Sequence, residues 1–267
     1  MTRLEFQPAQ SIMKKTNPAL LSLVAAMTLP LAAAAADQDT RCYELRTYYA
    51  NEGKLDALNA RFRNHTVALF EKHGMTNVGY WVPLENDANK LVYLMAYPSR
   101  EARGTMWKAF FNDPNWKAAY QASVANGKLV KRVDSLFLKA TDYSMFTNPA
   151  KADKERVFEL RTYTTNEGKL DGLNARFRDH TVALFEKHGI ENIGYWTPMD
   201  SKHGRDNKLI YLIAHKSVDG RKAAFGAFGK DPKWQAARKA SEVNGRLLVR
   251  KGVQSLMLKP TGYSPMK

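Results

Sequence analysis

The sequence predicts an α+β protein made of two tandem ferredoxin-like β-α-β-β-α-β modules. Three observations predict this fold: a long internal repeat, the same order of strand and helix patterns in each copy, and a polar segment between the copies. Residues 44–83 recur as residues 159–198 with eight of 40 positions different. The repeating unit spans about 105 residues, which is the size of a domain, so the chain is predicted to be a domain duplication.

Each copy begins with a strand and a helix. Apolar and polar residues alternate along 42–49 and place two sets on opposite faces of a strand: Tyr43, Leu45 and Thr47 against Glu44, Arg46 and Tyr48. Asn51 is expected to cap a helix that runs to residue 73, where Gly74 supplies the stop. Leu58, Phe62 and His65 follow the helical spacing of its apolar face.

The rest of the module follows the same plan. Strands are expected at 77–82, 91–97 and 133–139, with helices at 100–111 and from Asp113-Pro114 onward, where Asp is a good cap and Pro suits the first helical position. Helices then cover one face of each sheet and leave the other bare. We expect the two sheets to meet by their bare faces, which gives an α/β barrel with pseudo-two-fold symmetry in one chain. The protein is therefore either a monomeric pseudo-dimer or a further homodimer.

The first 36 residues are expected to be a signal peptide. Lys14 and Lys15 precede an apolar stretch, and a run of alanines ends before Asp37, which is the order of a cleavable secretory signal. The mature protein is then periplasmic or secreted, with no membrane span. The predicted organisation is a signal peptide at 1–36, module 1 at 41–145, a linker at 146–155 and module 2 at 156–264.

Charge and motifs narrow the function classes. The formal net charge is +15, which favours anionic ligands or leaves a solvated basic surface; nucleic acid is not expected for an exported protein. The sequence contains no dinucleotide-binding, phosphate-loop or nucleophile-elbow motif. His65 and His73 lie too far apart along a helix to share a zinc ion, so no metal site is predicted.

Several motifs occur in the same order in both copies and resemble those of the NIPSNAP family. They read E-L-R-T-Y, G-K-L, R-F-R-x-H-T-x-x-L-F-x-K-H-G and G-Y-W. The resemblance covers both modules and implies the dimeric α/β-barrel fold. It implies no settled biochemical role for a bacterial, exported member. Fold relatives include cofactor-free monooxygenases and haem enzymes, which is an analogy of fold alone.

The main candidate site is the second face of the first strand in each copy. If the other face packs under the helices, these side chains point into the barrel, where a charge must be paired. They either fix the docking of the two sheets or hold an anion between arginines and tyrosines. The predicted ligand-binding residues are Glu44, Arg46, Tyr48, Tyr80, Tyr93, Glu159, Arg161, Tyr163, Tyr195 and Tyr211.

His65 and His180 are the catalytic candidates. On an apolar helix face each is either a buried, satisfied histidine or a general base or haem ligand. No cofactor is predicted, since no motif supports haem. The sequence therefore favours a protein that binds a small anionic or aromatic molecule in the barrel. The alternatives are a cofactor-free or haem-dependent oxidoreductase and a structural or interaction protein.

The two copies diverge in their third strand and second helical region. Tyr97 corresponds to His215, Trp107 to Phe225 and Phe111 to Gly229. If a ligand lies between these elements, one copy binds while the other supports. Recent partial gene conversion would leave the same pattern.

Overall fold

The computed structural model describes residues 1–2, 38–144, 146 and 156–267. Residues 3–36 of the expected signal peptide and nearly all of the expected linker lie outside these ranges. From residue 38 onward the described residues form one compact unit that contains both copies. None of the helices in the described part of the chain is long and apolar enough to cross a membrane.

The element order repeats as predicted. In the first copy the elements are β1 (Cys42–Ala50), α1 (Leu55–Arg61), η1 (Phe62–Thr66), α2 (Val67–Lys72), β2 (Thr76–Pro83), β3 (Lys90–Tyr97), α3 (Arg100–Asn112), α4 (Pro114–Val124) and β4 (Val130–Ala140). In the second copy they are β5 (Val157–Thr165), α5 (Leu170–Arg176), η2 (Phe177–Thr181), α6 (Val182–Lys187), β6 (Glu191–Pro198), η3 (Ser201–His203), β7 (Lys208–His215), α7 (Val218–Lys230), α8 (Pro232–Ser241) and β8 (Leu248–Pro260).

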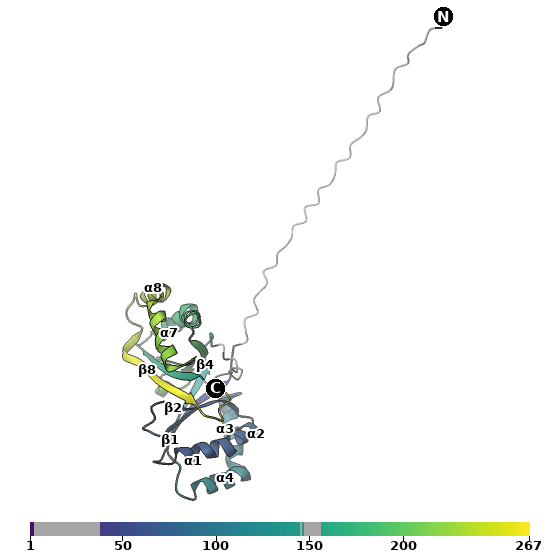
Figure 1. The fold of residues 1–267 in the computed structure, drawn as a ribbon, viewed down its shortest axis with the longest axis vertical. Coiled ribbons are helices and arrows are strands. Elements are labelled where there is room, and N and C mark those ends of the chain that lie inside the picture. Colours follow the sequence, from purple (N-terminus) through teal and green to yellow (C-terminus); the bar gives the residue numbers. More distant parts are fainter. Residues whose placement is uncertain (3–37, 145, 147–155) are drawn as a thin grey trace. The chain divides into compact units, whose positions relative to one another are not determined.

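The eight strands close into one barrel in the order β1-β3-β2-β8-β5-β7-β6-β4. Each module contributes four neighbouring strands, and the two sheets join at their edges through β2 with β8 and β4 with β6. Helices α1 to α4 lie on one side of the barrel, and α7 and α8 lie on the other (Figure 1). The predicted α/β barrel within a single chain is confirmed, because each copy covers the sheet of the other.

The inside of the barrel is an apolar core. Tyr43 packs there with Trp81 and Trp196, and Leu45 packs against the same cluster. The expectation that this face of β1 lies under the helices is therefore wrong, and Glu44 and Arg46 face the helices instead. Sequence alternation defines two faces but not their direction. Water cannot reach the barrel interior, whereas the helices leave part of the outer face of the sheet exposed. Burying the charged side chains therefore costs less free energy on the outer face than inside the barrel.

The G-Y-W motif has a packing reason. The indole of Trp81 folds back over Gly79, where an added Cβ would lie only 2.3 Å from the ring, and Trp196 covers Gly194 in the same way. Any side chain at these glycines would displace a tryptophan from the barrel core.

The first long helix of each copy contains a π-helical turn, η1 and η2. A π turn adds one residue to the helical repeat, which shifts the buried positions that follow. Thr66 and Thr181 take the inward positions, and His65 and His180 are exposed. The expectation that the two histidines lie on the apolar face is wrong for this reason.

Of the two helix caps predicted from the sequence, one is found in the structure and one is not. Asp113 caps α4 as predicted, since its carboxylate accepts the Asn115 N–H at 2.8 Å and Pro114 begins the helix. Asn51 does not cap α1, which starts only at Leu55; its side chain donates to the Lys128 carbonyl at 2.7 Å and ties β1 to the end of the module.

Candidate functional site

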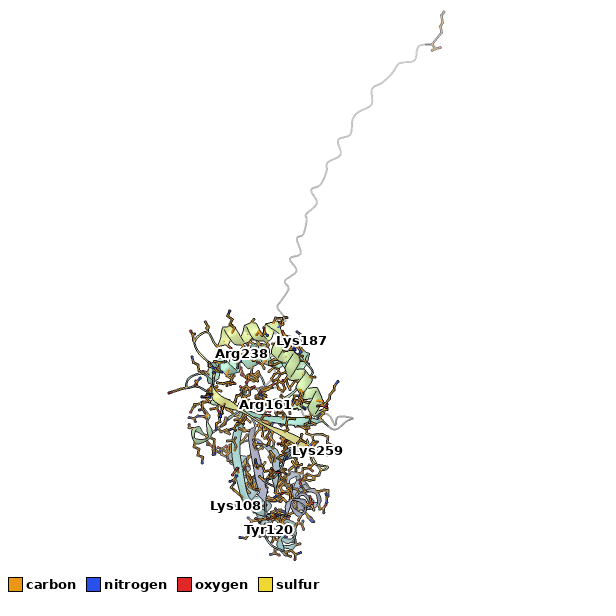
Figure 2. The ribbon with its side chains drawn as sticks, turned by 60° about the vertical axis from the view of Figure 1, so that its left-hand side comes forward. Lys108, Tyr120, Arg161, Lys187, Arg238 and Lys259 are labelled. Atoms are coloured by element: carbon orange, nitrogen blue, oxygen red, sulfur yellow. The ribbon has the colours of Figure 1, made fainter. Side chains whose placement is uncertain are left out.

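Each module holds a charged cluster between the outer face of its sheet and one helix. Half-site 1 consists of Glu44, Arg46, Tyr48, Tyr93, Tyr97, Arg103, Trp107 and Ser135. Half-site 2 consists of the corresponding residues Glu159, Arg161, Tyr163, Tyr211, His215, Arg221, Phe225 and Ser255. Figure 2 shows Arg161 among the strands beneath the helices of module 2. The side chains come from four elements in each module: β1, β3, α3 and β4, or β5, β7, α7 and β8.

Glu44 is the centre of half-site 1 and is fully buried. Arg103 reaches down from α3 and donates to both carboxylate oxygens at 2.8 Å. Ser135 of the neighbouring strand donates at 2.6 Å, and Arg46 closes an ion pair. Burial opposes ionisation, but the hydrogen bonds and charge of Arg103, Arg46 and Ser135 hold the pKa of Glu44 below its ordinary value. The carboxylate is therefore ionised at neutral pH.

Arg46 lies beside Glu44 under α3. Its Nε donates to the Tyr93 hydroxyl at 2.8 Å, and its guanidinium lies 4.5 Å from the centre of the Trp107 ring. Burial tends to lower the pKa of Arg46, but the neighbouring tyrosines and Glu44 raise it above its ordinary value. The guanidinium stays charged against an aromatic face, which is a favourable cation–π arrangement.

Half-site 2 repeats this geometry. Arg221 of α7 donates to the two oxygens of Glu159 at 2.6 and 2.7 Å, and Ser255 donates at 2.6 Å. Arg161 pairs with Glu159 and donates to the Tyr211 hydroxyl at 2.8 Å. Burial again opposes ionisation, and donation from His215 and Arg221 keeps the pKa of Glu159 well below its ordinary value.

Each half-site carries one carboxylate and two guanidinium groups, which leaves one excess positive charge. The outer arginines are partly exposed, with 23% of the Arg103 side chain and 26% of the Arg221 side chain accessible. Strand β4 is not covered beside half-site 1, because Val133 is 39% exposed and Phe137 is only half-buried. Strand β8 is likewise uncovered beside half-site 2, where Val253 is 43% exposed and Met257 is half-buried, so each cluster is cationic and reachable from solvent along one edge.

The predicted ligand-binding residues fall into two groups. Six of them, three from each first strand, lie in the half-sites together with Tyr93 and Tyr211. Tyr80 and Tyr195 belong to the helix–sheet core; their rings stack on Tyr93 and Tyr211 at 5.3 Å between centroids, and their hydroxyls bond Asn77 and Asn192. The prediction that the charged set points into the barrel is wrong, but the set does form one cluster in each copy.

His65 and His180 lie away from both half-sites. Both are exposed on the π-helical turns, and neither lines any of the cavities described below. Their position offers no enclosed surroundings in which an imidazole would be held against a substrate, so we give them no part in the function proposed below.

The sequence did not single out Arg103, Arg221, Ser135 or Ser255 as site residues. A signal for them exists, because each residue is kept between the copies although the block around the two arginines has diverged. A charged residue that stays the same while the helix around it diverges indicates a contact that both copies need. Here that contact is with a buried carboxylate.

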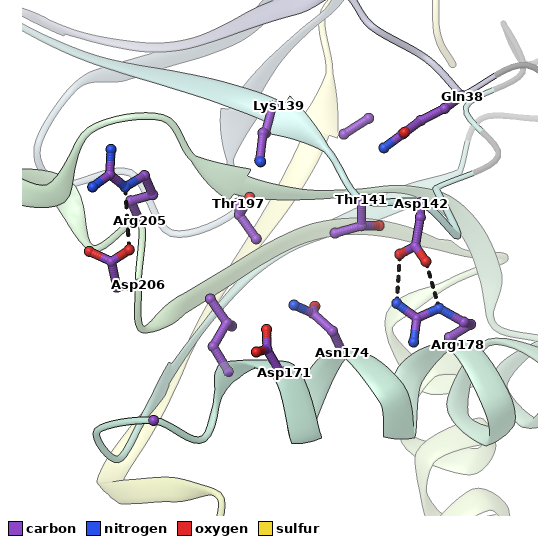
Figure 3. A pocket seen from close by; sticks show the side chains of 13 residues that line it. Gln38, Lys139, Thr141, Asp142, Asp171, Asn174, Arg178, Thr197, Arg205 and Asp206 are labelled. Carbon is purple, nitrogen blue, oxygen red and sulfur yellow. Dashed lines mark hydrogen bonds and ion pairs between the residues drawn. The ribbon is translucent and has the colours of Figure 1, made fainter.

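One shallow cavity of about 530 Å³ reaches half-site 1 at Ser135, and the others lie elsewhere. The barrel interior retains only about 10 Å³, lined by apolar side chains that include Leu45, Trp81 and Trp196, and this is too small for anything larger than a single water molecule. A cavity of about 740 Å³ lies between β4, α5 and the β6–β7 connection (Figure 3).

This cavity is an open depression lined by both acidic and basic side chains. Arg178 pairs with Asp142 through two hydrogen bonds of 2.8 and 2.7 Å, and both side chains are more than 40% exposed. Exposed pairs of this kind hold little free energy, and no residue of either half-site lines the cavity. In the described ranges, no group of three or more His, Cys, Asp and Glu side chains is placed to hold a metal ion.

The fold and the duplicated charged cluster define a tandem dimeric α/β-barrel protein. The NIPSNAP family model matches residues 43–145 and 158–265. The chain therefore belongs to the NIPSNAP family, with two domains of that family in tandem. A protein NipSnap homolog from Dictyostelium discoideum is 27% identical over 198 residues, which is 73% of this chain and 78% of that protein.

A solved structure that covers most of this chain shares its fold. A protein from Lactobacillus acidophilus that is proposed to be a monooxygenase matches with a TM-score of 0.53 at 11% identity, over 83% of this chain and 94% of that one. A NIPSNAP-like domain protein from Burkholderia xenovorans matches with a TM-score of 0.36 at 18% identity, over 41% of this chain and 90% of that one. Identities this low speak for the fold alone.

Proposed function

We propose that this protein binds a small organic anion at a helix–sheet half-site. The observation that carries the proposal is the excess positive charge of each cluster, held in a partly buried place with one edge toward solvent. A buried cluster that served only to fix the fold could balance its charges; here a second arginine is added to a carboxylate that Arg46 or Arg161 already neutralises. The excess charge is available to a carboxylate from outside.

The aromatic side chains favour an organic anion over an inorganic one. In half-site 1 the Arg103 guanidinium lies 4.9 Å from the Trp107 ring centre and 5.3 Å from that of Phe137. In half-site 2 the guanidinium groups of Arg161 and Arg221 lie 5.0 and 5.1 Å from Phe225. Planar guanidinium groups beside ring faces suit a ligand with a carboxylate and an apolar or aromatic body.

The experiment compares phenylacetate with its neutral amide, phenylacetamide, by calorimetric titration of the protein that begins near Asp37. We expect phenylacetate to bind at least about tenfold more tightly, which corresponds to about 1.4 kcal/mol. Arg103→Gln and Arg221→Gln are made separately and together, with Lys117→Gln as a control of equal charge change on an exposed helix. Arg103→Lys and Arg221→Lys keep the charge and should keep most of the binding.

Two results would overturn the proposal. One is equal binding of the acid and the amide, or binding of neither. The other is unchanged phenylacetate affinity in the Arg103→Gln/Arg221→Gln protein when its melting curve shows that it is folded.

We propose further that the mature protein is periplasmic or secreted. The support is the order of residues 14–36, in which a basic pair, an apolar stretch and small residues follow one another as in a cleaved signal. Expression of the whole sequence in a Gram-negative host, followed by osmotic-shock extraction and mass measurement, tests this. We expect an extracted chain that begins near Asp37; a full-length chain retained in the cytosol would contradict it.

A further inference from the structure

The two half-sites differ at one hydrogen bond. In half-site 1 the Trp107 indole N–H donates to the Tyr97 hydroxyl at 2.9 Å, and Tyr97 donates to Glu44 at 3.1 Å. Burial, followed by the charge of Glu44, raises the pKa of Tyr97, so the hydroxyl keeps its proton. Every polar atom of this chain of contacts has a partner.

In half-site 2 the corresponding chain is open. His215 takes the place of Tyr97, and its Nε2 lies 3.2 Å from Glu159. Phe225 takes the place of Trp107 and has no N–H to offer. The Nδ1 atom of His215 has no hydrogen-bond partner among the described residues, although only 1% of the side chain is exposed. A buried polar atom without a partner destabilises a fold unless a group from outside the chain satisfies it.

The proton arrangement of His215 follows from its neighbour. Glu159 is ionised and can only accept a hydrogen bond, so Nε2 must carry the proton. In the neutral imidazole Nδ1 is then an acceptor. While the imidazole is neutral, the open position of half-site 2 is therefore a hydrogen-bond acceptor near Arg161 and Arg221, and it suits a ligand that carries both a negative charge and a hydroxyl group.

Helix α7 is the wall through which such a ligand would enter. Phe225 is half-buried where Trp107 is 4% exposed, and Gly229 stands where α3 has Phe111. A Cβ added at Gly226 or Gly229 would meet no atom within 4 Å, so close packing does not require either glycine. An interior glycine weakens a helix relative to alanine, and α7 has two such glycines where α3 has only Gly104, so α7 is easier to displace than α3.

We infer that half-site 2 is the binding site of the protein and that it selects hydroxy acids. The carboxylate lies against Arg221 and Arg161, and the hydroxyl donates to Nδ1 of His215. Half-site 1 keeps the same scaffold, but Tyr97 offers no free acceptor, because its hydroxyl already bonds both Trp107 and Glu44. This inference rests on the proposed function, because it names the half-site and the ligand class for the anion.

The test uses two probes that differ by one hydroxyl, mandelate and phenylacetate. For the mature protein we expect mandelate to bind about three- to tenfold more tightly, the range of one net hydrogen bond. Long-range ¹H–¹⁵N spectra should show the Nδ1 resonance of His215 moving on addition of mandelate and not of phenylacetate. His215→Tyr, which restores the residue of half-site 1, should abolish the preference, and Tyr120→Phe, which removes an exposed hydroxyl on α4 outside both half-sites, should leave it unchanged.

Should His215→Tyr fail to fold, His215→Phe provides the same test, because it removes Nδ1 while Glu159 keeps its contacts with Arg221, Arg161 and Ser255. Equal affinity for the two acids overturns this inference and leaves the anion-binding proposal standing. A His215 resonance that ignores mandelate, as a trapped water alone would give, overturns it as well. Binding of neither acid overturns both proposals.

Discussion

Half-sites 1 and 2 are built on nearly the same sequence, yet the Tyr97 hydroxyl of one has all its partners and the Nδ1 atom of His215 in the other has none among the described residues. Their carboxylate, paired arginine, strand tyrosine and serine are the same, and both place an arginine from the covering helix over the carboxylate. The half-sites differ in the two residues that surround this shared set: Tyr97 and Trp107 in half-site 1 correspond to His215 and Phe225 in half-site 2. The shared layer fixes the fold, and the layer that differs sets which atoms remain free for a ligand.

The largest expected effect concerns what the half-sites share. Glu44→Gln and Glu159→Gln each leave two arginines without their anion, so we expect each to lower the free energy of unfolding by about 3–5 kcal/mol. Asp134→Asn, at an exposed carboxylate of β4, is the control and should change it by less than about 0.5 kcal/mol. Urea titration monitored by tyrosine and tryptophan fluorescence gives the values. A loss below about 1 kcal/mol at either site would mean that the cluster is not held as the structure describes it.

The same carboxylates predict how stability depends on pH. Their folded pKa values lie below the ordinary value of 4.5, so they stabilise the fold above that pH and lose the contribution as pH falls through the folded values. We expect the melting temperature of the natural protein to drop toward that of Glu44→Gln/Glu159→Gln under acid conditions. A gap between the two proteins that stays constant from pH 7 to pH 2 would contradict this.

A pair of reverse exchanges sharpens the comparison at the layer that differs. Trp107→Phe removes the indole that bonds Tyr97 and should cost about 1–3 kcal/mol. Phe225→Trp should give no comparable gain, because its indole N–H would point to the place of His215 Nε2, which already donates to Glu159. Thermal unfolding of both variants measures the two effects. Destabilisation by Phe225→Trp would show that half-site 2 has no room for the larger ring.

The smallest expected effect distinguishes the covering helices. Gly226→Ala and Gly229→Ala in α7 should each stabilise the protein by about 0.5–1 kcal/mol, since alanine restricts the unfolded chain and favours helix. Gly104→Ala, at the open glycine of α3, is the matched control for stability. If α7 must move to admit the ligand, the α7 variants should also slow mandelate association in stopped-flow traces, and Gly104→Ala should not.

The sequence predicted the order of elements, the duplication and the barrel, because each depends on local patterns and on the bare sheet face that one module leaves. It did not predict which face of β1 turns inward. Tyr43 and Tyr48 offer similar aromatic bulk on the two faces, and only the helices of the finished fold decide between them.

The site was predictable only in part. Glu44, Arg46 and Tyr48 share one face of a strand, so their grouping followed from alternation. Arg103 joins them from an element 59 residues away, and no local pattern links the two. His65 was misplaced because a π turn is not visible in a 3.6-residue spacing. The exchange of Tyr97 for His215 was visible, but its meaning depended on the indole of Trp107 that stands beside only one of them.

The most direct measurement is the number of mandelate molecules bound per chain, obtained by calorimetric titration or native mass spectrometry. The natural protein is predicted to bind one, Arg103→Gln still one, and Arg221→Gln none. Two molecules per chain, or binding that is lost with Arg103 and kept without Arg221, would contradict the assignment of the open half-site as the place where this protein binds its ligand.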